Sequence, residues 1–139
     1  MSTLKQKYGT KVFLGGTCNG SNWRDLVIPK LEVPYYNPAL AVNEDWDVIK
    51  ESQDRRLLCN CALYVITPEM EGAYSIAEIV EDSIIRKNNV VVCFLKQHAD
   101  KEFSDSTWKS CLAIMELIKQ YHQHVYTDLD SAIQAVNRL

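Results

Sequence analysis

The residues most suited to chemistry in this chain lie between positions 67 and 78. This segment follows residues 62–66, a continuous apolar run typical of a strand buried on both faces. It supplies three carboxylates beside a glycine and a tyrosine: Glu69, Glu71, Glu78, Gly72 and Tyr74. A carboxylate fixed at the end of a strand could attack a sugar carbon or give a proton to a leaving group.

Glu78 also has a purely structural interpretation. The sequence from Ser75 to Glu78 fits a capping box, in which Glu78 bonds back to the Ser75 amide at the start of a helix. The two interpretations are compatible, because the dipole of the helix would keep a glutamate in its first turn ionised. An ionised, rigidly placed carboxylate is what attack on a sugar carbon requires.

A second candidate loop spans residues 15–24 and follows the apolar run 11–14. Gly15 and Gly16 would let the backbone approach a ligand closely, and the loop leads into a helix N-terminus that favours anions. The loop matches neither the dinucleotide fingerprint nor the phosphate loop of nucleotide triphosphatases. A ligand loop and a plain turn are about equally good interpretations.

Strand and helix patterns alternate along the whole chain. Strands are expected at 11–14, 34–38, 62–66, 90–95 and 124–126, and helices at 23–31, 45–60, 75–87, about 108–118 and 129–136, the last capped by Thr127 and Asp130. This alternation predicts one α/β domain over residues 1–139: a three-layer, flavodoxin/Rossmann-like fold with about five mainly parallel strands and helices on both faces. Ligands of such sheets bind beyond the carboxyl ends of the strands.

Composition narrows the function classes. The chain has 139 residues, 47% of them apolar and 24% charged, as in an ordinary globular protein. A net charge of −3 without a basic stripe argues against a DNA or RNA polymer as partner. No apolar run approaches the ~20 residues of a membrane span, and residues 1–10 carry no signal-peptide core, so we expect no membrane partner and a cytoplasmic location.

The cysteines and histidines do not indicate a metal site. Of the five cysteines, Cys61, Cys93 and Cys111 lie in apolar segments, where cysteine acts as a small hydrophobe, and no zinc-type pairs occur. His122 and His124 form a His-x-His without a third ligand of matching context. We therefore expect reduced, buried thiols, no metal and no cofactor.

Several short motifs occur together in a fixed order. They are FLGGT at 13–17, NGS at 19–21, WR at 23–24, YNP at 36–38, YVITPEM at 64–70 and SIAE at 75–78. Together they resemble the nucleoside 2-deoxyribosyltransferase-like family over roughly residues 11–95, and the last third of the chain is similar in architecture only.

The resemblance implies a retaining reaction at C1′ of a 2′-deoxynucleoside. Glu78 occupies the position of the family's nucleophile, which forms a covalent deoxyribosyl-enzyme that a second base or water then intercepts. The residues expected to bind the substrate are Gly15, Gly16, Thr17, Asn19, Trp23, Arg24, Asn37, Gly72 and Tyr74. The family's usual acidic residue after the third strand has no clean counterpart here, so Glu69 is the candidate general acid, with Asp45 and Asp47 as weaker ones.

Three functions remain open at this point. The leading one is transfer or hydrolysis on a nucleoside or its monophosphate. A phosphate would call for basic or amide donors near the first loop, and since Arg24 is the only obvious basic group there, the nucleoside is favoured. The second is a binding module that senses nucleotides, with Glu78 only as a cap. The third is an NAD-cleaving glycohydrolase. The family's enzymes are usually oligomeric, which implies a homo-oligomer here.

Overall fold

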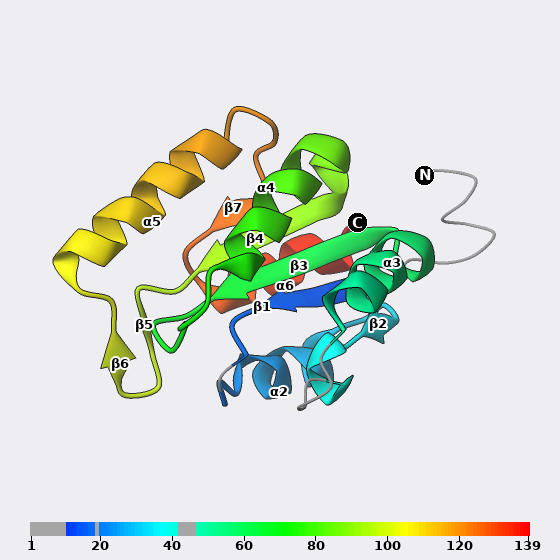
Figure 1. Cartoon of the computed structure of the whole chain (residues 1–139), viewed down its shortest axis with the longest axis horizontal. Coiled ribbons are helices and arrows are strands. Elements are labelled where there is room, and N and C mark those ends of the chain that lie inside the picture. Colours follow the sequence, from blue (N-terminus) through cyan, green and yellow to red (C-terminus); the bar gives the residue numbers. More distant parts are fainter. Residues whose placement is uncertain (1–10, 19, 42–46) are drawn as a thin grey trace.

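A five-stranded parallel sheet forms the centre of the molecule (Figure 1). The computed structural model describes residues 11–18, 20–41 and 47–139. The strands are β1 (Val12–Gly16), β2 (Tyr35–Tyr36), β3 (Cys61–Ile66), β4 (Val90–Phe94) and β7 (Val125–Tyr126), in the spatial order β2-β1-β3-β4-β7. The parallel α/β fold predicted from the alternating patterns is confirmed.

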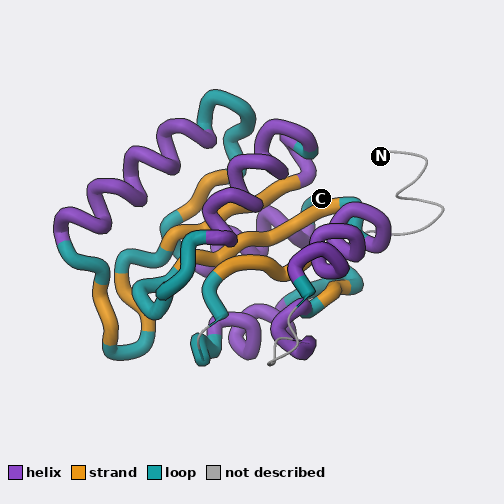
Figure 2. Tube along the Cα trace, viewed as in Figure 1, coloured by secondary structure: helices purple, strands orange, loops and turns teal. Residues whose placement is uncertain are grey.

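Helices cover both faces of this sheet (Figure 2). They are α2 (Trp23–Val27), α3 (Val48–Leu58), α4 (Tyr74–Ile85), α5 (Asp105–Ile118) and α6 (Leu129–Asn137), with short 3-10 turns η1 (Ile28–Lys30), η2 (Pro38–Ala41) and η3 (Lys87–Asn89). The core that contains residues of α2 and α6 lies on one face, and the core that contains residues of α4 and α5 lies on the other.

Strand β3 explains why the sheet needs two layers of helices. Its residues alternate between the two faces, so that Leu63 belongs to the core with α6 and Tyr64 to the core with α4. All six residues of β3 are buried. A strand buried on both faces reads as one apolar run, which is the pattern of residues 62–66.

Several predicted boundaries differ from the structure. Helix 23–31 ends at Val27 and continues as a 3-10 turn, since Pro29 lacks the amide that an α-helix needs. Strand 34–38 is reduced to two residues at the sheet edge between Pro34 and Pro38. Helix 45–60 begins at Val48, where Asp47 accepts hydrogen bonds from the amides of Ile49 and Lys50.

The two other large differences concern a hairpin and a helix cap. A small antiparallel sheet of β5 (Gln97–His98) and β6 (Lys101–Glu102) follows β4, and no sequence pattern had indicated it. Asp128, and not the predicted pair Thr127 and Asp130, caps α6, because its carboxylate accepts from the Ser131 amide.

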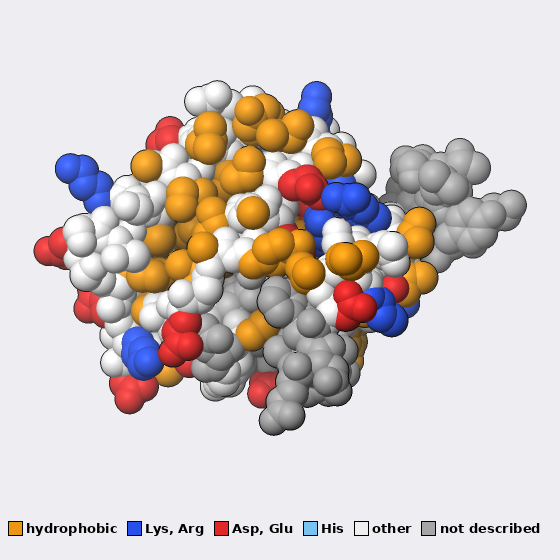
Figure 3. All heavy atoms as spheres, viewed as in Figure 1, with side chains coloured by type: hydrophobic (Ala, Val, Ile, Leu, Met, Phe, Trp, Pro, Cys, Tyr) orange, Lys and Arg blue, Asp and Glu red, His pale blue; other side chains and the backbone are white. Residues whose placement is uncertain are grey.

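Helix α3 contradicts the amphipathic pattern that predicted it. Its apolar residues Ile49, Leu57 and Leu58 are exposed, and the exposed fraction of Leu57 reaches 82%. The buried member of this helix is instead Arg55. Further apolar side chains are exposed on α4 and α5, where Figure 3 shows hydrophobic side chains gathered on one face. Within the described residues, no helix is long and apolar enough to cross a membrane.

Candidate active site

The carboxyl end of β1 comes very close to β3. A Cβ atom on Gly15 would overlap the Tyr64 ring, and one on Gly16 would overlap the main chain of Val65. Gly16 also has a φ of 120°, a conformation that L-residues with side chains rarely adopt. These glycines are thus the last residues of the strand, and not a turn after it as the sequence had indicated. Glycine at both positions lets the end of β1 lie this close to β3.

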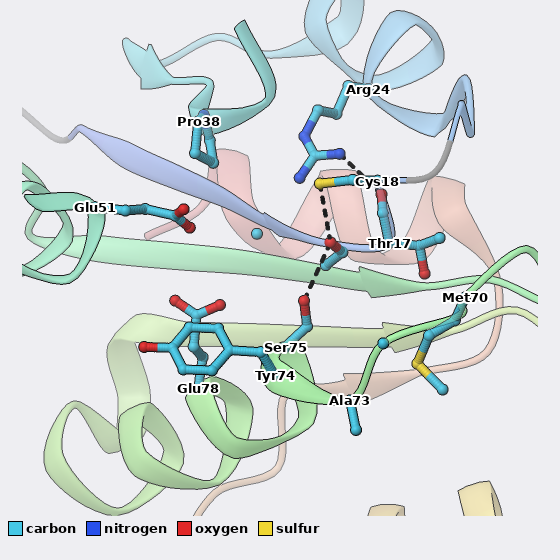
Figure 4. A pocket seen from close by; sticks show the side chains of 13 residues that line it. Thr17, Cys18, Arg24, Pro38, Glu51, Met70, Ala73, Tyr74, Ser75 and Glu78 are labelled. Carbon is cyan, nitrogen blue, oxygen red and sulfur yellow. Dashed lines mark hydrogen bonds between the residues drawn. The ribbon is translucent and has the colours of Figure 1, made fainter. Parts of the chain in front are cut away.

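A cavity of about 290 Å³ borders the end of β1 (Figure 4). It lies where β1 is flanked by β2 on one side and β3 on the other, the point at which the strand order of such sheets reverses and ligands usually bind. Its lining residues are Gly15, Gly16, Thr17, Cys18, Arg24, Pro38, Glu51, Met70, Gly72, Ala73, Tyr74, Ser75 and Glu78.

Seven of the predicted site residues meet in this cavity: Gly15, Gly16, Thr17, Arg24, Gly72, Tyr74 and Glu78. The sequence segments 15–24 and 72–78 are therefore brought together, as expected for loops at one edge of a parallel sheet. Asn19 and Asp45 lie outside the described residues. Asp47 caps α3 and does not line the cavity.

Three predicted residues lie elsewhere. Trp23 is fully buried, and its indole N–H donates to the Thr17 carbonyl, so it belongs to the core. The Asn37 side chain accepts from the Ala39 amide and stabilises a turn. Glu69 accepts from the Thr67 hydroxyl, and its Oε1 lies 3.8 Å from His98 Nε2. The assignment of Glu69 as the general acid of this cavity therefore has no support in its position.

Arg24 lines the cavity, but its guanidinium is hydrogen-bonded to main-chain carbonyls. Its Nε and Nη2 donate to the carbonyl of Leu14, and its Nη1 donates to the carbonyl of Thr17 at 2.9 Å. It is buried, which lowers its pKa, and its Cζ lies 4.3 Å from the centre of the Trp23 ring. Arg24 therefore holds the β1–α2 loop in place.

Glu78 does not form the predicted capping box. The residue at the N-cap of α4 is Ala73, which has no capping side chain, and Ser75 Oγ donates instead to the Gly16 carbonyl at 3.2 Å. Glu78 thus lies in the second turn of α4, and its carboxyl group points into the cavity (Figure 4). The Ser75 bond ties the start of this helix to the end of β1.

The Glu78 carboxyl is buried and incompletely paired. Only 5% of its surface is exposed, and its Oε2 has no hydrogen-bond partner among the described residues. Burial raises its pKa from 4.5 to about 8, and the nearby Glu51 adds to that effect, whereas Arg55 opposes it. The expectation that the helix dipole keeps Glu78 ionised is wrong, because Glu78 lies beyond the first turn of α4 and a pKa of about 8 leaves its carboxyl largely protonated at neutral pH.

The residue that the sequence reasoning missed is Glu51. It lies in the first turn of α3 and lines the cavity on the wall opposite Glu78 (Figure 4). A usable signal existed, because a helix that follows one parallel strand and leads into the next starts near the carboxyl edge of the sheet. Cys18, Pro38, Met70, Ala73 and Ser75 complete the wall.

The remaining polar candidates are structural. His122 Nε2 lies 3.0 Å from Ser83 Oγ, and its Nδ1 accepts from the His124 amide; burial lowers the His122 pKa to about 4. No group of three metal-ligating side chains occurs in the part of the chain that the structure describes. The cysteines are all free thiols, and each except Cys18 is buried.

Known proteins add no further information. Comparison with protein-family models, curated proteins and solved structures found no match for this chain. The chemistry of the site must therefore be argued from its geometry. Two carboxyl groups, Glu51 and Glu78, face one small cavity whose floor is glycine backbone and whose rim carries the Tyr74 ring.

The protonation of Glu78 predicts how stability changes with pH. In the unfolded chain this group ionises near 4.5, whereas the folded protein holds its proton up to about 8. Folding is thus disfavoured increasingly between these two pH values. Glu78→Gln removes the titration, so its free energy of unfolding should exceed that of the wild type by a margin that grows with pH to a few kcal/mol, in order of magnitude.

Urea unfolding at pH 5, 6.5 and 8.5 measures this margin. Glu116→Gln is the matched control, because Glu116 is an exposed carboxylate on α5 and its replacement should give a margin that barely changes with pH. A margin for Glu78→Gln that stays constant over the same range would show that Glu78 titrates as an ordinary carboxyl group.

Proposed function

We propose that this chain cleaves the N-glycosidic bond of a 2′-deoxynucleoside, by base exchange or by hydrolysis, through a covalent bond between Glu78 and C1′. The observation that carries the proposal is the Glu78 carboxyl, which is buried, has no hydrogen-bond partner at Oε2 within the described structure, and is aimed into a cavity at the ligand-binding edge of the sheet. The resemblance of its surroundings to the nucleoside 2-deoxyribosyltransferase-like family supports the same reaction.

The size and charge of the cavity favour a nucleoside. About 290 Å³ is at the lower end of the range of small-molecule sites. The basic side chain on its wall, Arg24, already donates to main-chain carbonyls, and a phosphate would share the cavity with Glu51 and Glu78. These features favour an uncharged nucleoside over its monophosphate, with no cofactor or metal in the reaction.

The reaction needs two groups on opposite sides of the sugar. An ionised Glu78 oxygen forms a bond to C1′ while the C1′–N bond breaks. The electron pair of the C1′–N bond stays with the base, which must then take up a proton. In the second step water or another base attacks C1′ from the same side as the departed base and gives its proton to the group that protonated the first base, while the electron pair of the ester bond returns to Glu78. The sugar therefore keeps its configuration.

We assign the proton donor to Glu51. It faces Glu78 across the cavity, which is where the departing base would lie if Glu78 attacks from the other side (Figure 4). Glu69 is hydrogen-bonded to Thr67 outside this cavity. The roles parallel those in retaining glycosidases, where one carboxyl group attacks and the other protonates the leaving group.

The covalent intermediate is the decisive test. Intact-protein mass after incubation with a panel of 2′-deoxynucleosides at pH 8.5, where Glu78 is ionised, should rise by one deoxyribosyl unit in the wild type and not in Glu78→Ala. Free base in the same samples is measured by chromatography, since rapid hydrolysis would drain the adduct.

The opposite result has a definite meaning. If the wild type shows neither adduct nor free base with any nucleoside, the chain is not an enzyme of this class. The binding module then becomes the better function, and one observation favours it: a Glu78 that is protonated at neutral pH is a hydrogen-bond donor and not a nucleophile. Ligand affinity that survives Glu78→Gln would agree with that function.

The two candidate acids can be separated by substitution. Glu51→Gln should lower kcat on 2′-deoxynucleosides about 10²-fold or more, the usual contribution of general acid catalysis, and Glu69→Gln should change it less than about threefold. With 4-nitrophenyl 2-deoxyriboside, whose leaving group needs no proton, Glu51→Gln should recover most of its activity. An equal loss in both variants, or no recovery, would argue against Glu51 as the acid.

Self-association is proposed through the exposed apolar side chains of α4 and α5. Ile84, Ile85, Leu112 and Leu117 are each more than 40% exposed. Figure 3 shows hydrophobic side chains gathered over these two helices, and such patches often mark protein interfaces. Sedimentation velocity should show an oligomer for the wild type and a smaller species for Ile85→Glu. A wild-type monomer at micromolar concentration would contradict this proposal. The oligomer and a cytoplasmic location both remain predictions.

A further inference from the structure

Arg55 is the buried residue of a helix that exposes its apolar side chains. Only 2% of its side-chain surface is exposed, and its guanidinium lies between α3 and α4 against carboxylates of α4. A buried arginine is costly unless carboxylates surround it. The reaction outlined above gives it no part, so its place in the structure requires another explanation.

Three carboxylates of α4 surround this guanidinium. Nη1 lies 2.6 Å from Asp82 Oδ1, and Nη2 lies 2.9 Å from Glu81 Oε1, so both ends of the fork are hydrogen-bonded. The third contact is different. Nε lies 3.4 Å from Glu78 Oε2, and neither atom has a hydrogen-bond partner within the described residues.

The guanidinium cannot easily turn away from Glu78. Asp82, its partner at Nη1, also accepts from the Tyr64 hydroxyl and lies 3.3 Å from Arg86 Nε. Arg86 in turn donates to the carbonyl of Arg55 itself at 2.6 Å. The planar fork is therefore fixed by β3 and α4, and its unused N–H faces the carboxyl group in the cavity.

We infer that Arg55 is the positioning residue of Glu78: its Nε–H donates to Oε2 once Glu78 is ionised, which leaves Oε1 as the atom that attacks C1′. The inference rests on the proposed function for the role of Glu78 as nucleophile. The proton of Glu78 goes to solvent, and the guanidinium charge stabilises the carboxylate that remains. The same contact stabilises this carboxylate again when it leaves C1′ in the second step.

The electrostatics of the site agree with this role. Arg55 lowers the pKa of Glu78, against burial and the nearby carboxylates of Glu51, Asp82 and Glu81. Ionisation of the carboxyl would strengthen the contact, because a charge-assisted hydrogen bond is shorter and stronger than a neutral one.

The test measures the pKa of Glu78 directly, without turnover. Carbon-13 NMR of labelled glutamate side chains identifies the Glu78 signal by its absence in Glu78→Gln. Arg55→Gln should raise this pKa by about one to three units, the usual effect of an adjacent opposite charge. Arg56→Gln is the matched control: Arg56 also contacts Glu81, at 2.6 Å, but is exposed and does not reach Glu78, so its replacement should shift the pKa by less than about 0.5 units.

A wild-type measurement covers the case in which Arg55→Gln does not fold. The Nε–H signal of Arg55 in a nitrogen-15 titration should move downfield and exchange more slowly with water at the pH where Glu78 ionises. Absence of this coupled titration, or an unchanged Glu78 pKa in folded Arg55→Gln, would overturn the inference.

Measurement of kcat and KM then separates the effect of the Arg55 hydrogen-bond geometry from the effect of its charge. Arg55→Lys keeps the charge but cannot donate to three carboxylates in one plane, so kcat should fall about tenfold or more with little change in KM. If the wild type turns over no nucleoside, the proposed function fails while the NMR result still decides whether Arg55 is coupled to Glu78. If turnover is normal in Arg55→Lys, the proposed function survives and the positioning role does not.

Discussion

Charge balance in the space between α3 and α4 is the constraint on which the candidate site depends. Asp82 and Glu81 make short contacts with Arg55, and Arg56 and Arg86 add further positive charge beside them. Glu78 is the one carboxyl group of this cluster without a short contact to Arg55: it is buried, and its Oε2 lies 3.4 Å from Arg55 Nε. Burial without a dedicated cation is what raises its pKa to about 8. A protein that only needed a stable helix pair could replace such a cluster with apolar side chains at little cost.

The backbone of β1 is the second constraint, because it determines where the cavity lies. Gly15 and Gly16 pair with Tyr64 and Val65 in the parallel ladder, and any side chain at either glycine would collide with β3. The same strand end receives the Ser75 hydroxyl on the carbonyl of Gly16, which brings the start of α4 against it. The cavity is therefore bordered by the glycine end of β1 and by the start of α4, and Glu78 reaches it from one turn further along α4.

The sequence predicted the parts of this structure that depend on local patterns. Continuous apolar runs such as 62–66 identified the buried strands, and the alternation of patterns identified the parallel sheet and the edge at which loops 15–24 and 67–78 meet.

Prediction from the sequence failed where a tertiary contact outweighs a local one. Ser75 and Glu78 have the spacing of a capping box, but the hydroxyl of Ser75 donates to Gly16 instead. Trp23 looked like a ligand contact and is a core residue, and α3 turns its arginine inward and its leucines outward. Glu51 and Glu69 are both acidic residues near strand ends, and only the packing of α3 against the cavity distinguishes them.

A Glu78 that is protonated at rest is compatible with the proposed glycosidic chemistry. The pKa of its carboxyl is raised by burial and by the nearby Glu51, which lines the same cavity. A sugar that is losing its base develops positive charge at C1′ and the ring oxygen, directly beside this carboxyl. In the proposed reaction, that charge would favour the ionised form of Glu78 more strongly in the transition state than before the substrate binds. Part of the electrostatic cost of burying the carboxyl would then be recovered only as the glycosidic bond breaks. Arg55 lowers the electrostatic cost of an ionised Glu78 before any substrate binds. Its positive charge belongs to the protein, so it neither leaves with the base nor arrives with the substrate. This compensation is incomplete, because Nη1 and Nη2 are already hydrogen-bonded to Asp82 and Glu81 and only Nε faces Glu78.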